Sequence, residues 1–170
     1  MTLFSGNPVS LRQHKMLLFA VVAVAVILLS QLSGYLVNLY IPQQSTVELN
    51  ALLHFTHVRN HGGVFGMLQG RGWQFALISA VLLAAVITYL YRARNLPLYE
   101  YLCFGFIVGG GTSNVLDRLL YGSVIDFIDV QHIPGWNYVF NTADLMIHVG
   151  IWPLLFMSLF GQRFLKNSAP

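Results

Sequence analysis

Fourteen consecutive apolar residues, Met16 to Leu29, open the longest hydrophobic segment of this 170-residue chain. The segment continues to residue 41 with polar positions interspersed, and a helix of that length crosses a bilayer. Three further apolar segments could also span a membrane. We therefore predict an all-α membrane protein in which residues 1–170 form a single integral membrane domain, with four transmembrane helices at about 16–41, 72–91, 98–116 and 139–160.

The composition excludes several classes of protein. The chain is 56% hydrophobic and only 9% charged, whereas a soluble protein has about 25% charged residues. Its net charge of +3 comes from nine Lys and Arg that form no basic patch, so we expect no nucleic acid partner. The single cysteine, Cys103, excludes a disulfide within the chain and a cysteine-based metal site.

Most of the basic residues flank the apolar segments, as cytoplasmic residues of membrane proteins do. Six of the nine do so: Arg12, Lys15, Arg92, Arg94, Arg163 and Lys166. We therefore place both termini in the cytoplasm and residues 42–71 and 117–138 outside it. The outer insertion, at about 42–71, is rich in β-branched and aromatic residues from Thr46 to Phe65, which predicts short strands forming a small sheet over the outer mouth of the bundle.

Two acidic residues lie at positions where an ionised carboxylate near the hydrocarbon of the membrane costs free energy. Asp126 follows the third apolar segment and Asp144 lies at the start of the fourth, so both belong to the outer edge of the membrane. Two carboxylates sharing a site of low dielectric constant hold one proton between them. The ionised acid can then activate water while the protonated acid polarises a peptide carbonyl, which is aspartic protease chemistry. The alternative is that neither acid is catalytic: Asp126 is merely solvated at the interface, and Asp144 caps a helix or pairs with another residue within the bundle.

Polar neighbours favour the catalytic interpretation. Asn114 is spaced three and four residues from Asp117 and Arg118, so the three share a helix face if the third helix continues that far. Asn141 precedes Asp144 by three residues and could orient its carboxylate. We expect Asp129 to face solvent on a loop.

Histidines offer a competing metal site. His54, His57 and His61 would share one helix face and could bind zinc, but their segment has the composition of a strand. His148 follows Asp144 by four residues and could hydrogen-bond it. We predict neither a metal ion nor another cofactor.

Three segments in order carry a resemblance to a known family: "VRNHGGVFGMLQGRGWQFAL", "GGGTSNVLDRLLYGSVIDFI" and "FNTAD". They resemble the Asn-x-Gly-x-x-Phe, Asn-x-x-Asp-Arg with Val-x-Asp-Phe, and Phe-Asn-x-Ala-Asp motifs of the lipoprotein signal peptidases (signal peptidase II), bacterial four-span aspartic proteases. The resemblance covers most of residues 16–160.

The resemblance implies that Asp126 and Asp144 are the catalytic dyad. It also implies an outer β cradle with a short surface helix, and supporting roles for Asn60, Gly62, Asn114, Arg118 and Asn141. Its substrates would be lipid-modified prolipoproteins, cut just before the diacylglyceryl-cysteine at the extracytoplasmic face of the bacterial inner membrane. The partners are then this substrate and membrane lipid, and we expect a monomer.

The first helix departs from the family pattern. Where the family has Asp-Gln-x-x-Lys, this chain keeps Gln31 but has Ser30 and Gly34 in place of the two charges. Because both charges are replaced together, neither is left unpaired in the bundle. Ser30, Gly34 and Asn38 recur every fourth residue, and we expect that face to turn inward. The departure leaves open a divergent paralogue cutting another membrane-anchored peptide, and a non-catalytic four-span binding protein.

Overall fold

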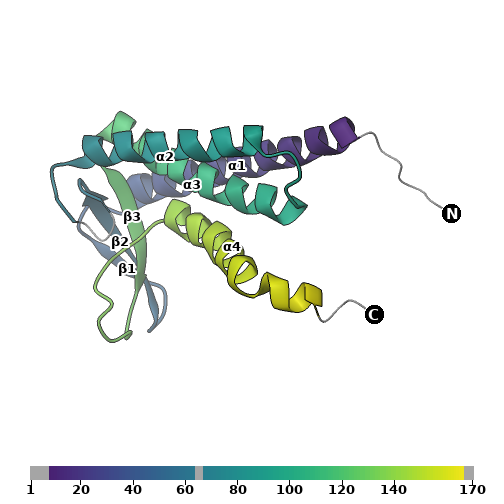
Figure 1. The fold of residues 1–170 in the computed structure, drawn as a ribbon. Helices are drawn as coiled ribbons and strands as arrows, with labels where there is room; N and C mark the ends of the chain where they lie inside the picture. The colour runs from purple at the N-terminus through teal and green to yellow at the C-terminus, as the bar shows by residue number, and fades with distance from the viewer. Residues whose placement is uncertain (1–7, 64–66, 167–170) are drawn as a thin grey trace.

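The computed structural model describes residues 8–63 and 67–166. In that part of the chain a bundle of helices carries a small sheet at one end (Figure 1). The elements, in chain order, are α1 (Pro8–Tyr40), β1 (Thr46–Glu48), β2 (Leu53–Asn60), α2 (Gly72–Arg92), α3 (Leu98–Tyr121), β3 (Val124–Val130) and α4 (Thr142–Lys166).

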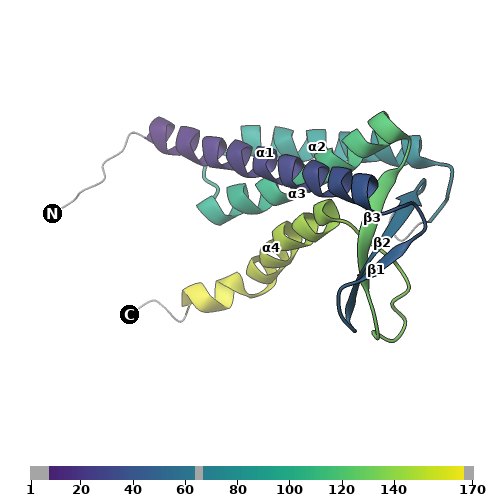
Figure 2. The same cartoon turned by 180° about the vertical axis from the view of Figure 1, so that it is seen from behind.

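Helix α3 is the central helix of the bundle, because it packs against α1, α2 and α4. The sheet lies where α1 and α3 end and α2 and α4 begin, while the start of α1 and the end of α4 point away from it (Figures 1 and 2). Two separate clusters of buried apolar side chains hold this arrangement. Tyr101 and Leu90 belong to the cluster inside the bundle, whereas Val37, Ile125 and Phe127 join α1 to the sheet.

Three of the described helices are long and apolar enough to cross a membrane: Leu11–Tyr40, Gly72–Arg92 and Thr142–Gly161. Their surfaces carry large exposed apolar side chains such as Leu17, Leu82 and Trp152, which water would not favour. Helix α3 is not among them, since it carries acidic and basic residues and a run of glycines. The prediction of transmembrane helices is therefore confirmed for three segments, and the count of four is not.

The helices differ from the predicted ranges at their ends. Helix α1 begins at Pro8, before the apolar run, and α4 begins at Thr142 rather than near 139. Helix α3 continues past 116 to Tyr121, where Gly122 adopts a left-handed conformation (φ 70°) and its N–H donates to Arg118 O at 3.0 Å. The polar residues 114, 117 and 118 are therefore all helical.

Glycines let the central helix approach its neighbours closely. A Cβ on Gly109 would lie 2.7 Å from Ala23 O of α1, and one on Gly110 would lie 2.4 Å from Ala143 O of α4. Real side chains do not tolerate such distances. The glycine run is thus a packing feature, which sets how near α3 lies to the first turn of α4.

The sheet is antiparallel with strand order β1-β2-β3. Thr46 pairs with Thr56, Val58 pairs with Asp126, and the register shifts between Phe55 and Val58. The predicted strands of the outer insertion are present, but the third strand comes from the segment after α3, for which our interpretation of the sequence is a loop. That interpretation was wrong because β2 supplies a partner for this segment from far along the chain.

Two further predictions need correction. Asp129 is not a solvent-facing loop residue: it lies half-buried on β3 and accepts a 2.7 Å hydrogen bond from Thr56 Oγ1. The short surface helix is absent from the part of the outer insertion that the structure describes, where residues 50–52 form a bend and residues 67–70 form a turn instead.

Candidate active site

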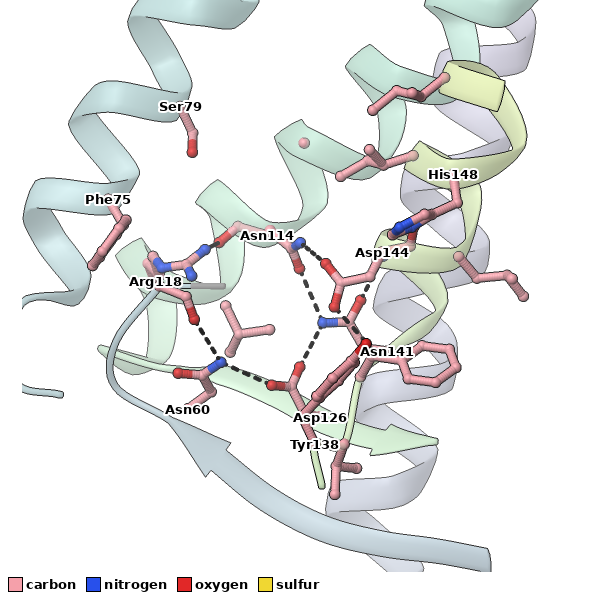
Figure 3. Close-up of a pocket in the computed structure, with 18 of the residues that line it drawn as sticks. Asn60, Phe75, Ser79, Asn114, Arg118, Asp126, Tyr138, Asn141, Asp144 and His148 are labelled. Atoms are coloured by element: carbon pink, nitrogen blue, oxygen red, sulfur yellow. Dashed lines mark hydrogen bonds between the residues drawn. The ribbon is translucent and has the colours of Figure 1, made fainter. Parts of the chain in front are cut away.

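A cavity of about 730 Å³ opens at the junction of the sheet with the bundle. Residues of β3, α2, α3, α4 and the 131–141 connection line it, and Figure 3 shows how the polar side chains gather on one wall. Asp126 and Asp144 both line this cavity. Residues from far apart in the sequence therefore meet in one place.

Asp126 is held by two amide side chains. It lies on β3 with 4% of its surface exposed, and its pairing with Val58 fixes its position on the sheet. Asn60 Nδ2 donates to Asp126 Oδ2 at 2.9 Å, and Asn141 Nδ2 donates to Asp126 Oδ1 at 2.7 Å. Each carboxylate oxygen thus receives one amide hydrogen bond.

Asp144 is fixed by the way α4 begins. Asn141 precedes the helix, and its Oδ1 accepts from the Asp144 backbone N–H at 2.9 Å, while Asp144 Oδ2 accepts from the Asn141 N–H at 3.3 Å. This reciprocal pair is a capping box with Asn and Asp in the two positions. The other carboxylate oxygen, Oδ1, accepts from Asn114 Nδ2 at 2.8 Å.

Asn141 therefore joins the two acids. The same side chain that caps α4 beside Asp144 donates to Asp126, and its Nδ2 also lies 3.2 Å from Asn114 Oδ1 (Figure 3). Any movement of Asn141 would change the relation between the two carboxylates. The arrangement places both acids on one side of the cavity, where amide side chains donate to both carboxylates.

Arg118 supports the site from α3. Its guanidinium donates to Asn114 O at 3.1 Å and to Gly62 O at 3.0 Å. It connects the central helix to the turn that follows Asn60, the last residue of β2 and an amide partner of Asp126. Its Nε is buried and has no hydrogen-bond partner among the described residues.

The turn after β2 is closed by Asn60 and two glycines. Asn60 Oδ1 accepts from Gly62 N–H at 3.0 Å, and its Nδ2 donates to Gly63 O at 3.1 Å. A Cβ on Gly62 would lie 2.2 Å from Met67 O, so no larger residue fits there. Gly62 does not line the cavity, and it acts by placing its carbonyl against Arg118.

Burial makes Asp126 hard to ionise. The pKa of Asp126 rises from 3.8 to about 7; removal of the carboxyl group from water is the main cause, and the neighbouring charge of Asp144 is the second. The amide donors Asn60 and Asn141 and the positive charge of Arg118 oppose this shift. At neutral pH Asp126 therefore holds a proton in a large fraction of the molecules, beside a second carboxyl group.

The structure brings together six of the seven residues that sequence predicted for the site. Those lining the cavity are Asn60, Asn114, Arg118, Asp126, Asn141 and Asp144, with Gly62 directly behind them. Two neighbours are placed differently from the sequence expectation. Asp117 turns away from the cavity and accepts a 2.7 Å hydrogen bond from Gln31 Nε2 on α1, and His148 Nδ1 lies 2.8 Å from the backbone oxygen of Asp144 rather than from its carboxylate.

The face of α1 with Ser30 and Gly34 is buried as expected, but Asn38 is exposed and accepts a hydrogen bond from Arg59. His54 and His57 lie on β2, so the helical face that a zinc site needed is not formed. In the described ranges, no three His, Cys, Asp or Glu side chains lie close enough together to hold a metal ion.

Sequence reasoning missed the apolar wall of the cavity. Phe75 of α2, Trp136 and Tyr138 of the 131–141 connection, and Trp152 of α4 line it. Aromatic residues near the ends of apolar segments are a signal for the membrane interface. Nothing in their spacing indicates that they face one cavity.

Comparisons with known proteins agree on one family. A family model described as Signal peptidase (SPase) II matches residues 22–160. The chain is similar to the lipoprotein signal peptidase of Syntrophomonas wolfei, with 36% identity over 84% of this chain and 94% of that protein. It is also similar to the lipoprotein signal peptidase of Coxiella burnetii, with 39% identity over 78% of this chain and 84% of that protein. A solved bacterial membrane enzyme has a TM-score of 0.77 and 26% identity, covering 89% of this chain and 93% of its own.

Proposed function

The chain belongs to the signal peptidase II family, and from that premise we propose that it is an aspartic endopeptidase whose dyad is Asp126 and Asp144. It is a protease of the bacterial membrane that processes lipoproteins. The observation that carries the aspartic assignment is the bridging by Asn141, which binds both acids at the edge of one cavity.

The dyad works with one proton. The ionised carboxylate takes a proton from a water molecule, whose oxygen attacks the carbonyl carbon of the scissile peptide bond. The protonated carboxyl group hydrogen-bonds the carbonyl oxygen and stabilises the negative charge that develops there. When the C–N bond breaks, a carboxyl group supplies the proton that the leaving amine takes up. The raised pKa of Asp126 supports this sharing of one proton.

The amide residues are positioning residues in this scheme. Asn60, Asn114 and Asn141 donate to the carboxylates, and within the described ranges no hydrogen bond joins a cationic side chain to either acid. A direct ion pair would hold both acids ionised, whereas amide donors tolerate a shared proton. Arg118 contributes its charge from a longer distance and fixes the turn after β2.

The substrate is a prolipoprotein, cut before a cysteine that carries a diacylglyceryl group. The cavity supports this substrate because its polar wall continues into an apolar wall, with Ile147, Ile151 and Trp152 along α4. Trp152 is 63% exposed on a helix apolar enough to span the membrane, so the cavity adjoins the lipid. A peptide bond next to two acyl chains could reach the dyad at this depth without leaving the membrane.

The placement in the membrane is also part of the proposal. We place the sheet and dyad at the extracytoplasmic face and both termini in the cytoplasm, on the distribution of basic residues. Helix α3 is the fourth span, enclosed by the other three. We expect a monomer of one domain, residues 1–170, that contacts membrane lipid.

Removing either acid tests the dyad. Asp126→Asn and Asp144→Asn should each abolish cleavage of a diacylglyceryl prolipoprotein by the purified protein in lipid. Asp129→Asn is the matched control, because it neutralises another carboxylate of the same strand that lies outside the cavity. Full cleavage by either dyad variant would refute the assignment.

The product identifies the substrate class. Mass spectrometry should find a new N-terminus that begins with the lipidated cysteine. A cut at another position would favour the divergent paralogue, and absence of cleavage by the wild-type protein would favour a binding protein. Ser30 and Gly34 do not line the cavity, so the departures in α1 leave its wall intact and no observation favours these alternatives.

A further inference from the structure

A second cavity lies at the end of the bundle opposite the sheet. It has a volume of about 270 Å³ and is formed by the start of α1 and the 93–97 connection between α2 and α3, which lie together in Figures 1 and 2. Three cations line it: Arg12, Lys15 and Arg94. None of the described residues that line this cavity is acidic.

Backbone contacts preform this cationic cavity. Arg12 donates to Tyr91 O at the end of α2, and Lys15 Nζ donates to Leu96 O at 2.8 Å. These bonds fasten α1 to the α2–α3 connection and draw the two positive groups inward. These two bonds use only some of the hydrogen-bond donors of Arg12 and Lys15, since a guanidinium group has five N–H donors and an ammonium group has three.

One of the remaining donors is buried. Arg12 Nε is shielded from solvent and has no hydrogen-bond partner in the described part of the chain. A buried donor without an acceptor is costly, and the guanidinium that carries it shares the cavity with two like charges, Lys15 and Arg94. An anion with several oxygen atoms would satisfy the donor and offset the repulsion at the same time.

The depth of the cavity indicates the source of the anion. Arg12 and Lys15 come directly before the apolar run of α1, and Arg94 follows the apolar helix α2, so the cavity lies where both helices leave the hydrocarbon. Lipid phosphates occupy that level of a bilayer. Basic pockets between transmembrane helices bind anionic headgroups there.

We propose that this cavity binds the phosphate of an anionic phospholipid headgroup, held by Arg12, Lys15 and Arg94. The site lies at the opposite end of the bundle from the dyad and does not depend on the proposed catalytic chemistry. The bound lipid would hold the start of α1 against the connection between α2 and α3.

Lipid retention tests the proposal. The full chain is purified in mild detergent, stripped of lipid and offered phosphatidylglycerol or phosphatidylcholine, with bound lipid counted by native mass spectrometry. We expect phosphatidylglycerol to be retained in preference to phosphatidylcholine. Arg94→Gln should lower its retention about fivefold, the effect expected for one cation near an anionic headgroup, and Arg12→Gln should lower it further.

The variants separate binding from folding. Arg94 is exposed and, within residues 8–63 and 67–166, makes no hydrogen bond to the backbone like those of Arg12 and Lys15, so Arg94→Gln should keep the helical circular dichroism of the wild type. Arg92→Gln is the matched control, since it removes a cation of the same interface that does not line the cavity, and it should retain lipid fully. Equal losses in Arg92→Gln and Arg94→Gln, or equal retention of both lipids, would overturn the proposal. Thermal unfolding of the lipid-stripped protein is also measured with phosphatidylglycerol and with inorganic phosphate. If inorganic phosphate raises Tm as much as phosphatidylglycerol does, the site binds free phosphate and not lipid.

Discussion

Asn141 Nδ2 lies 2.7 Å from Asp126 Oδ1, although strand β3 and the start of α4 are separated by the 131–141 connection. The same residue caps α4 and receives the backbone N–H of Asp144. One side chain thus has a local role, capping the start of α4, and a long-range role, holding Asp126 and Asp144 in a fixed relative position. Its two roles can be separated by substitution.

Asn141→Ser keeps an N-cap oxygen but loses the amide that donates to Asp126. A hydrogen bond to a charged group is worth about 1.5–3 kcal/mol, so we expect cleavage to fall roughly 10- to 100-fold while α4 stays folded. Steady-state kinetics on a lipidated precursor measure the loss. Ser33→Ala is the control, because it removes a neutral hydrogen bond to Thr142 in the first turn of the same helix. A loss of similar size in both variants would show that helix docking, and not the amide, matters.

The pH profile follows from the raised pKa of Asp126, about 7. Since the proton shared by the dyad is lost above that pH, cleavage should decline as pH rises through about 7. Asn60→Ala removes a donor that favours the ionised form, so the decline should move to higher pH in this variant. Single-turnover rates between pH 5 and 9 measure both curves. An alkaline limb that stays in place in Asn60→Ala would contradict the role given to Asp126.

Stability should depend on pH through the same group. Because the folded pKa of Asp126 is about 7 and its ordinary value is 3.8, the folded state binds the proton more tightly than the unfolded state. The unfolding free energy therefore falls as pH rises from about 4 to 7, and Tm should fall with it. Asp126→Asn no longer titrates, so its Tm should change less over this range. Parallel curves for the two proteins would show that other groups cause the dependence.

Two buried serines at the contact of α1 with α3 should respond oppositely to alanine. Ser30 Oγ is buried without a hydrogen-bond partner among the described residues, whereas Ser113 Oγ accepts from Gln31 Nε2 at 3.0 Å. Ser30→Ala removes an unsatisfied hydroxyl and should leave Tm unchanged or raised, while Ser113→Ala should lower stability by about 1 kcal/mol. Thermal unfolding in one detergent compares them. A larger loss in Ser30→Ala would mean that its hydroxyl has a partner in the membrane.

The helices could be predicted from the sequence because an apolar run of about 20 residues has the length and composition of a helix that spans a bilayer. The third strand could not, since β3 needs β2 as its partner, and pairing over more than 60 residues leaves no local pattern. Helix α3 was predicted as a span from its length, but its glycines and charged residues suit a helix enclosed by others.

The residues of the candidate site could be predicted where a charged side chain near the membrane costs free energy. Asp126 and Asp144 stood out for that reason, and Asn114 and Arg118 for their spacing. Asp117 shows the limit of spacing: successive helical residues are rotated by about 100°, so Arg118 can face the cavity while Asp117 faces Gln31 on α1. The apolar wall of the cavity could not be predicted, because its residues come from three segments with no shared motif.

The distance between α3 and α4 controls the site through one glycine. A Cβ on Gly110 would meet backbone, Ala143 O at 2.4 Å, next to the Asn114–Asp144 hydrogen bond, whereas one on Gly111 would meet the flexible end of Leu83 at 2.8 Å. Gly110→Ala should therefore push the helices apart and lower cleavage about 100-fold, since a displacement of 1 Å can cost that much, and overpacking should lower stability by about 1–3 kcal/mol. Gly111→Ala adds the same methyl group on the adjacent residue, which lines the cavity but would meet only a flexible side chain, so it should retain clearly more activity than Gly110→Ala. Kinetics and thermal unfolding of the pair decide the matter, and equal activity in the two variants would show that the contact of α3 with α4 does not set the position of Asp144.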